Sequence, residues 1–269
     1  MFFYVYIYRM KALSQKTTSK AKKSTRLKTS GSEHVYNDFV YGSAEGIQAN
    51  NCYAYAIDHY TKTPGHKLQP GELAGDLTNM NIGSCTELRR RVKRDNPSMY
   101  PIQAESSCRP GYFKVMAFLD KNDDYHWYKH HQDLLIRIRN GDTVQLIAKQ
   151  FGVPCRNVIF PRQGAIALIK NAGLWSHKRG LATGPLLQDA CGRLISDPRK
   201  ACRNYGEFDY KTMCGTFCTK NPMYNVPLKP ANNTRGKLQT RTRKKQGPPP
   251  AVRTQKVKQK SSRARKPRS

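Results

Sequence analysis

The chain has 269 residues, with 48 Lys and Arg against 18 Asp and Glu, and a formal net charge of +30. This length allows one large domain or two small ones. The charge is concentrated at the ends: eight basic residues and no acidic one lie in 1–28, and fifteen more basic residues, again without an acid, lie from Lys229 to Ser269. The remainder is only mildly basic, so we expect a globular middle between two basic arms.

The arms, 1–33 and 229–269, contain too few large apolar residues to form a core, and we predict that both are disordered. Basic tails bind polyanions by releasing counterions. Nucleic acid is therefore a candidate partner, although a solubilising or nuclear-targeting role fits the same composition.

The first eight residues, Met1 to Tyr8, are apolar but too short to span a bilayer. They lack the basic residue and the small-residue cleavage site of a secretory signal, and Met10 is an alternative start. We therefore expect no secretion through a signal peptide, no membrane partner and an intracellular location. Eight cysteines in such a chain are more often thiols or metal ligands than disulfides.

The first expected element is a helix from Cys52 to Ile57. Asn50 and Asn51 precede the cysteine, and asparagine is a favoured N-cap. A helix start stabilises a thiolate, the nucleophilic form of cysteine. A buried free cysteine that only packs is the structural alternative.

The next elements are a basic amphipathic helix from Ser84 to Val92 and a buried strand from Tyr112 to Asp120. A turn over 121–124 leads into a returning strand that carries His126 between two aromatic residues. His130 shares the face of His126 on this strand, yet we expect His130 to be exposed. His130 and His131 are alternatives for a base or a metal ligand.

Residues 136–153 contain a short strand, a Gly141-Asp142-Thr143 helix start and an apolar helical stripe through Ile147 and Phe151. This segment resembles the opening of a LysM module. The resemblance implies a βααβ insert over 134–170, with a second helix from Cys155 to Ile159 and a closing strand from Ala165 to Ile169. It also implies glycan as a partner, although the second half is shorter than the family pattern.

After the insert, a strand-like segment from Leu174 to His177 carries a further histidine, and a loop-rich finish ends near Pro227. Four cysteines lie in that finish, and their spacings fit no standard zinc template, so we expect buried thiols. The four are Cys191, Cys202, Cys214 and Cys218. Gly-rich phosphate loops and paired catalytic carboxylates are absent, and we expect no cofactor.

Cys52, His126 and His177 supply the three parts of a nucleophile, base and orienter constellation. His126 would take the thiol proton and form an ion pair that keeps the sulfur anionic, and His177 would fix the tautomer of His126. Order and local sequence resemble the NlpC-type papain-like cysteine hydrolases. The phrases Asn-Cys-Tyr-Ala-Tyr-Ala and Asp-Tyr-His-Trp-Tyr are also similar to uncharacterised proteins of giant DNA viruses.

The resemblance implies an α+β papain-like core over 34–133 and 171–228. It further implies a thiol-dependent hydrolase or acyltransferase acting on an amide bond, in a peptide or a peptidoglycan-like substrate. If the chain is viral, it implies a location in the virion or host cytoplasm. Here 51 residues separate the two histidines, where the family has a short hairpin. A catalytically silent virion or nucleic-acid-associated binding protein that uses its basic tails is the alternative.

Overall fold

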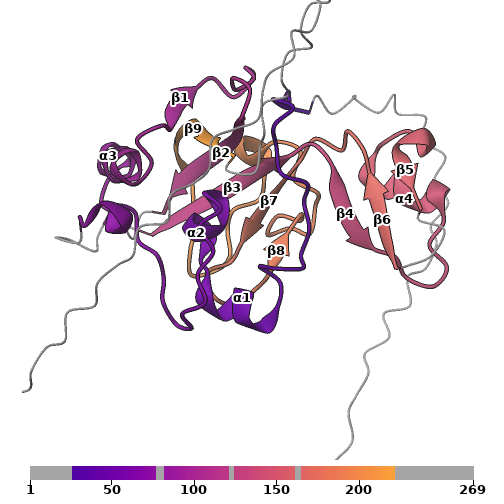
Figure 1. Ribbon diagram of the computed structural model, residues 1–269, viewed down its shortest axis with the longest axis horizontal. Helices are drawn as coiled ribbons and strands as arrows, with labels where there is room; N and C mark the ends of the chain where they lie inside the picture. The colour runs from indigo at the N-terminus through magenta and orange to yellow at the C-terminus, as the bar shows by residue number, and fades with distance from the viewer. Residues whose placement is uncertain (1–25, 77–81, 121–123, 161–164, 222–269) are drawn as a thin grey trace, which may run out of the picture. The chain divides into compact units, whose positions relative to one another are not determined.

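The computed structural model describes residues 26–76, 82–120, 124–160 and 165–221, and these form an α+β fold with two antiparallel sheets (Figure 1). The larger sheet has six strands in the order β1-β9-β2-β3-β7-β8. Its strands are β1 (Tyr100–Ile102), β2 (Tyr112–Leu119), β3 (Tyr125–His131), β7 (Leu174–Lys178), β8 (Pro185–Leu186) and β9 (Thr212–Lys220). The strands expected around 112–120, His126 and His177 are thus confirmed. The basic tail over 229–269 lies outside the described residues.

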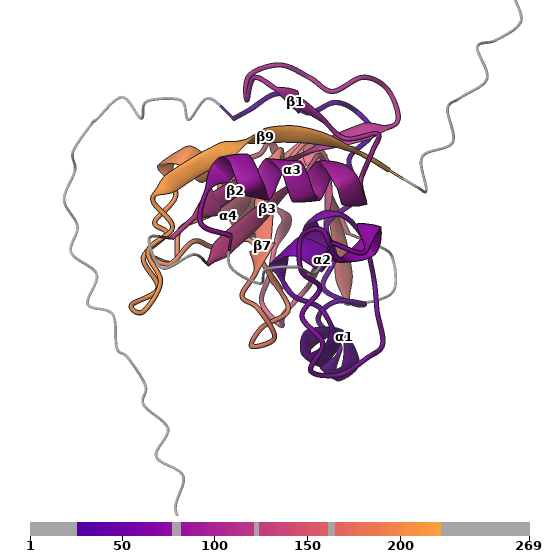
Figure 2. The same ribbon diagram turned by 90° about the vertical axis from the view of Figure 1, so that its left-hand side faces the viewer.

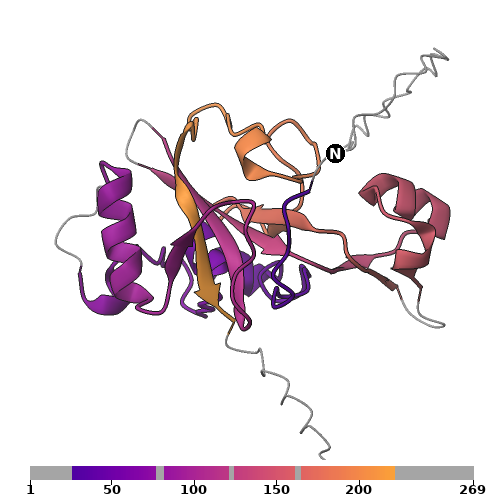
Figure 3. The ribbon, with the colours of Figure 1, turned by 90° about the horizontal axis from the view of Figure 1, so that it is seen from above.

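Four short helical elements precede the strands of the larger sheet: α1 (Ala44–Ala49), α2 (Cys52–Ala56), the 3-10 turn η1 (Glu72–Ala74) and α3 (Cys85–Asp95). A further 3-10 turn, η3 (Pro198–Lys200), lies between β8 and β9. Figure 2 shows α3 lying across the face of the sheet near β9, and Figure 3 shows the same helix from above. Ser84 caps α3, because its side-chain oxygen accepts a hydrogen bond from Glu87 N. The expected helix is confirmed and runs three residues beyond Val92.

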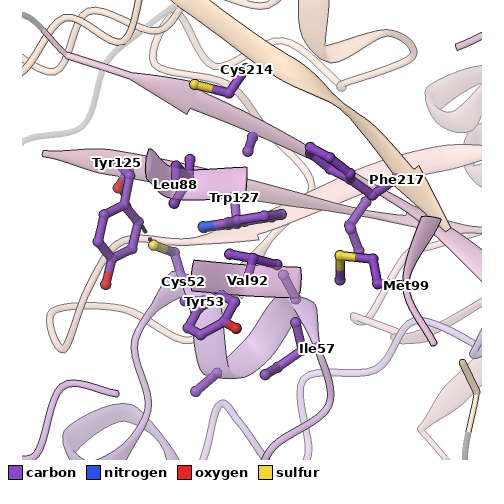
Figure 4. Packing of buried hydrophobic residues seen from close by; sticks show 14 of the residues in the cluster. Cys52, Tyr53, Ile57, Leu88, Val92, Met99, Tyr125, Trp127, Cys214 and Phe217 are labelled. Atoms are coloured by element: carbon purple, nitrogen blue, oxygen red, sulfur yellow. Dashed lines mark hydrogen bonds between the residues drawn. The ribbon is translucent and has the colours of Figure 1, made fainter. Parts of the chain in front are cut away.

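Helices α2 and α3 bury their apolar sides against the same face of the sheet. Tyr53 from α2 and Leu88 from α3 are fully buried there, together with Trp127 from β3 and Phe217 from β9 (Figure 4). Side chains alternate between the two faces of a strand, so His126 and Tyr128 belong to the opposite face. A second cluster with Trp175 and Tyr210 fills that face.

The segment between β3 and β7 forms the smaller sheet and one helix. Its elements are β4 (Leu134–Arg137), α4 (Val144–Phe151), the 3-10 turn η2 (Cys155–Asn157), β5 (Val158–Ile159) and β6 (Ile166–Ile169). Of the two candidate caps, Asp142 and Thr143, it is Thr143 that caps α4, by accepting from Leu146 N. The second helix of the expected βααβ pattern is wrong. Three residues after Pro154 leave room for one turn only, and the β-branched pair that follows joins β6 as a strand.

The expectation of free thiols or zinc ligands is also wrong, because six of the eight cysteines are paired. The disulfides are Cys85–Cys214, Cys108–Cys218 and Cys191–Cys202. Two free cysteines remain, Cys52, which is buried, and Cys155, which is exposed. Disulfides are typical of oxidising compartments and do not fit the intracellular location expected above.

The predicted disorder of the N-terminal arm is wrong for residues 26–33, and residues 1–25 lie outside the described part of the chain. Leu27 is buried in the cluster beneath Trp175, and the Arg26 guanidinium donates to the carbonyl oxygens of Phe151, Gly152 and Ala172. Residues 26–33 are therefore part of the folded unit. Burial of one apolar side chain and neutralisation of helix C-terminal carbonyls by a cation both favour this docking.

Candidate active site

Asn51 fixes the start of α2 and thereby the position of Cys52. Its side-chain oxygen accepts from Ala54 N at 3.0 Å, and its side-chain nitrogen donates to Leu68 O at 2.8 Å. The asparagine cap inferred from the sequence is thus confirmed. It ties the helix to the loop before η1 as well as satisfying a free helical amide.

The Cys52 sulfur lies against the backbone of β3. The thiol contacts Tyr125 O at 3.7 Å, and the Trp127 amide also hydrogen-bonds to the sulfur (Figure 4). Pairing between β3 and β7 begins only at Tyr128 and His177. The Tyr125 carbonyl and the Trp127 amide therefore have no partner on β7 and are available to the thiol. The sulfur therefore lies at the edge where the ladder stops, against the backbone of Tyr125 and Trp127, the two neighbours of His126.

His126 and His177 are joined directly, with His126 Nε2 at 2.8 Å from His177 Nδ1. The antiparallel pairing of β3 with β7 makes this contact possible, because 134–170 lies between the two strands as an insertion. The 51-residue separation in sequence therefore does not separate the two rings.

Hydrogen-bond partners fix the tautomers of both rings. His177 Nε2 lies 2.9 Å from Gln188 O, and a carbonyl only accepts, so this nitrogen carries the proton. In neutral His177 the other nitrogen, Nδ1, must then accept from His126 Nε2. Neutral His126 is left with an unprotonated Nδ1, which is the form that a general base needs.

The protonation states differ from the sequence-based expectation of an ion pair. Burial, followed by the charge of Asp124, raises the pKa of Cys52 to about 12. Burial, with His177 and Arg179 nearby, holds the pKa of His126 well below its usual range, and burial lowers that of His177 to about 4. No hydrogen bond joins Cys52 to His126 among the described residues. The resting site therefore contains a neutral thiol and neutral imidazoles.

Alkylation should report this resting state. We expect iodoacetamide to label exposed Cys155 faster than Cys52 at pH 7, because the thiolate is the reactive form and a raised pKa makes it scarce. Labelling of Cys52 should keep rising with pH beyond 8.5 without a plateau, since its pKa is displaced upward to about 12. Peptide mass spectrometry over a pH series measures both rates. A plateau for Cys52 below pH 7 would restore the ion-pair description.

A cleft of about 280 Å³ opens onto His126. Asp124 and Tyr210, which line it, both interact electrostatically with Cys52, but the buried thiol is not itself part of the lining. Its lining residues are Lys67, Asp124, His126, Arg179, Gly180, Leu181, Ala182, Tyr205, Phe208 and Tyr210. The cleft can hold a ligand beside the imidazole of His126.

Two other histidines differ from expectation or stand apart from this site. His130 is fully buried and stacks on Trp175 with 4.3 Å between ring centroids, so its expected exposure is wrong. His131 lies on the α2 face of the sheet, where its Nε2 contacts Ser176 Oγ at 2.7 Å. Neither contacts the His126–His177 pair.

Sequence reasoning missed two groups that hold His177. One is the Gln188 carbonyl, a backbone group that no side-chain pattern announces. The other is Tyr205, whose hydroxyl lies 3.4 Å from His177 Nε2. Asp189 supports this loop by accepting from the amides of Cys191 and Cys202.

Comparison of the chain with family models, with curated proteins and with solved structures finds no match. Within the described ranges, no helix has the length and apolar character needed to cross a bilayer. The same ranges hold no group of three or more His, Cys, Asp or Glu placed to bind a metal ion.

Proposed function

We propose that the chain is a thiol-dependent hydrolase or acyltransferase of the papain-like, NlpC type, acting on an amide bond of a peptide or peptidoglycan-like substrate. The observation that carries this proposal is the relay from Gln188 O through His177 to His126. It leaves Nδ1 of His126 as a basic nitrogen, and the neighbouring Tyr125 carbonyl on the same strand contacts the buried free thiol of Cys52.

Catalysis would begin with proton transfer from Cys52 to His126 Nδ1 as substrate enters. The sulfur then attacks the amide carbonyl, and the resulting oxyanion can meet the Cys52 amide at the start of α2. His126 returns the proton to the leaving amine, which leaves a thioester on Cys52. Water or an acceptor amine, deprotonated by His126, releases the acyl group. Burial disfavours the ion pair of Cys52 thiolate and His126 imidazolium in the resting site. Substrate binding must therefore supply part of the stabilisation of this ion pair.

The test is amide turnover with matched cysteine variants. A mixture of synthetic peptides is incubated with the protein, and new termini are identified by mass spectrometry. We expect Cys52→Ala to abolish turnover and Cys155→Ala to leave it unchanged, since Cys155 is free but exposed on the insert. Turnover that survives in Cys52→Ala rules out the proposed nucleophile.

A second candidate function is a binding protein in which this scaffold is silent. It is favoured by the 5% exposure of Cys52 and by its bond to a carbonyl rather than to an imidazole. Its partner would be a polyanion bound through the basic tail. Duplex DNA binding over a salt series should then show a steep slope for the full chain and a shallow slope after deletion beyond Pro230. Equal slopes would place the affinity in the folded unit, around Arg89 and Arg90.

A further inference from the structure

Two unpaired cations border the cleft beside His126. Arg179 follows directly after β7, and Lys67 lies on the loop before η1; both side chains are exposed. In the part of the chain that the structure describes, neither side chain forms an ion pair with a carboxylate. The cleft therefore offers two positive charges to an incoming ligand.

The negative charge in the cleft is partly engaged already. Asp124 is the carboxylate among the described lining residues, and its Oδ2 accepts from Tyr210 OH at 2.6 Å. His126 is neutral because burial keeps its pKa well below the usual range. The balance of the lining is positive, and the cleft would attract an anionic group rather than a cationic one.

Arg179 is held in a defined position. Its guanidinium lies 4.7 Å from the centroid of the Tyr205 ring, a cation–π arrangement that orients the planar group. Tyr205 in turn contacts His177, so Tyr205 fixes the position of the Arg179 guanidinium relative to the His126–His177 pair. A guanidinium fixed in this way can bind a carboxylate with two parallel hydrogen bonds.

The same cleft also offers apolar contacts to a ligand. Tyr205, Phe208 and Tyr210 form an aromatic wall, with Phe208 and Tyr210 stacked at 6.0 Å between centroids. Leu181 also lines the cleft. A ligand with one carboxylate and one apolar side chain would use both halves of this surface.

We propose that this cleft selects peptides that carry a carboxylate side chain beside the scissile amide, and that Arg179 is the residue that binds that carboxylate. The assignment of the cleft to substrate rests on the proposed function. It adds a substrate class, acidic peptides, and a specificity-determining residue.

A bound carboxylate would also activate the base. The positive charge of Arg179 contributes to the low pKa of His126, after burial and His177. Neutralising that charge with a substrate carboxylate weakens this contribution and makes His126 a stronger base. An acidic substrate would thus promote its own proton transfer from Cys52, whereas its amide analogue would not.

The experiment compares two fluorescein-labelled peptides, Ala-Leu-Glu-Ala-Leu and Ala-Leu-Gln-Ala-Leu, which differ by one carboxylate. Turnover is measured in the wild type, in Arg179→Gln and in Arg89→Gln, which removes the same charge from an exposed position on α3. We expect kcat/KM to favour the Glu peptide about tenfold in the wild type and in Arg89→Gln, as expected for a charge-assisted hydrogen bond. In Arg179→Gln the ratio should fall to about two or less.

Binding of the same peptides to Cys52→Ala, followed by fluorescence anisotropy, separates this inference from the proposed chemistry. Tighter binding of the Glu peptide that is lost in Cys52→Ala/Arg179→Gln supports the acidic-peptide cleft even if the wild type turns over neither peptide. Turnover without a Glu preference overturns the inference and leaves the proposed function standing. Equal or absent binding of both peptides, without turnover, overturns both.

Discussion

His126→Ala is expected to lower kcat/KM for a peptide amide by about a thousandfold, the range in which a general base contributes. His177→Ala should cost less, about ten- to a hundredfold, because His126 keeps its basic nitrogen and loses only the partner that fixes its tautomer. Steady-state kinetics on purified variants provides the measurement.

Two further variants control this comparison. His177→Asn should recover part of the loss, because its side-chain oxygen can still accept from His126 Nε2. His59→Ala should leave kcat/KM unchanged, since His59 lies outside the cleft lining. A greater loss in His177→Ala than in His126→Ala would mean that the two roles are reversed.

Removal of the disulfide between Cys85 and Cys214 should lower the free energy of unfolding by about 3–5 kcal/mol. The bond closes a loop with a sequence separation of 129, and cross-links across long loops restrict the unfolded chain most. It ties the first turn of α3 to β9, the strand between β1 and β2. Urea denaturation of Cys85→Ala/Cys214→Ala measures the loss, and calorimetry should show a fall in Tm of about 10 °C.

Cys155→Ala is the matched control for this cross-link, because Cys155 is exposed and free. Its stability should stay within about 0.5 kcal/mol of the wild type. An unchanged midpoint in the double variant, or in the wild type under reducing agent, would show that the pair is not bonded in solution.

Features that depend on neighbouring residues were predicted correctly from the sequence. The Asn51 cap, the Ser84 helix start and the alternation around His126 each depend on residues within one turn or one strand, and each appears in the fold. The contact between His126 and His177 was predictable only from the assumption that the intervening segment closes on itself.

The pairing of strands and cysteines that are far apart in the chain could not be predicted from the sequence. The sequence predicts a loop-rich ending here, from the Gly184-Pro185 and Asp197-Pro198 pairs, whereas Thr212–Lys220 forms strand β9 and pairs with β1 and β2. Without that strand in the sheet, nothing placed Cys214 beside Cys85 or Cys218 beside Cys108. The disulfides were missed for this reason.

The pKa of the Cys52 thiol also depends on burial, which the sequence pattern does not reveal. A helix of five residues offers a weak dipole, whereas Cys52 is enclosed by Tyr53, Trp127 and the β3 backbone. Desolvation dominates the helix start and raises the pKa of the thiol. The residue type was informative, but its protonation state followed from packing.

A search for an acyl-enzyme tests the role of Cys52 as nucleophile most directly. A peptide thioester is mixed with the protein, the reaction is quenched in acid within seconds, and intact mass and peptide mapping locate the acyl group. We expect one acyl group, bound as a thioester to Cys52, which is absent in Cys52→Ala and forms slowly in His126→Ala. Acylation of Cys155 instead, or no adduct on Cys52 while peptide is consumed, would contradict it.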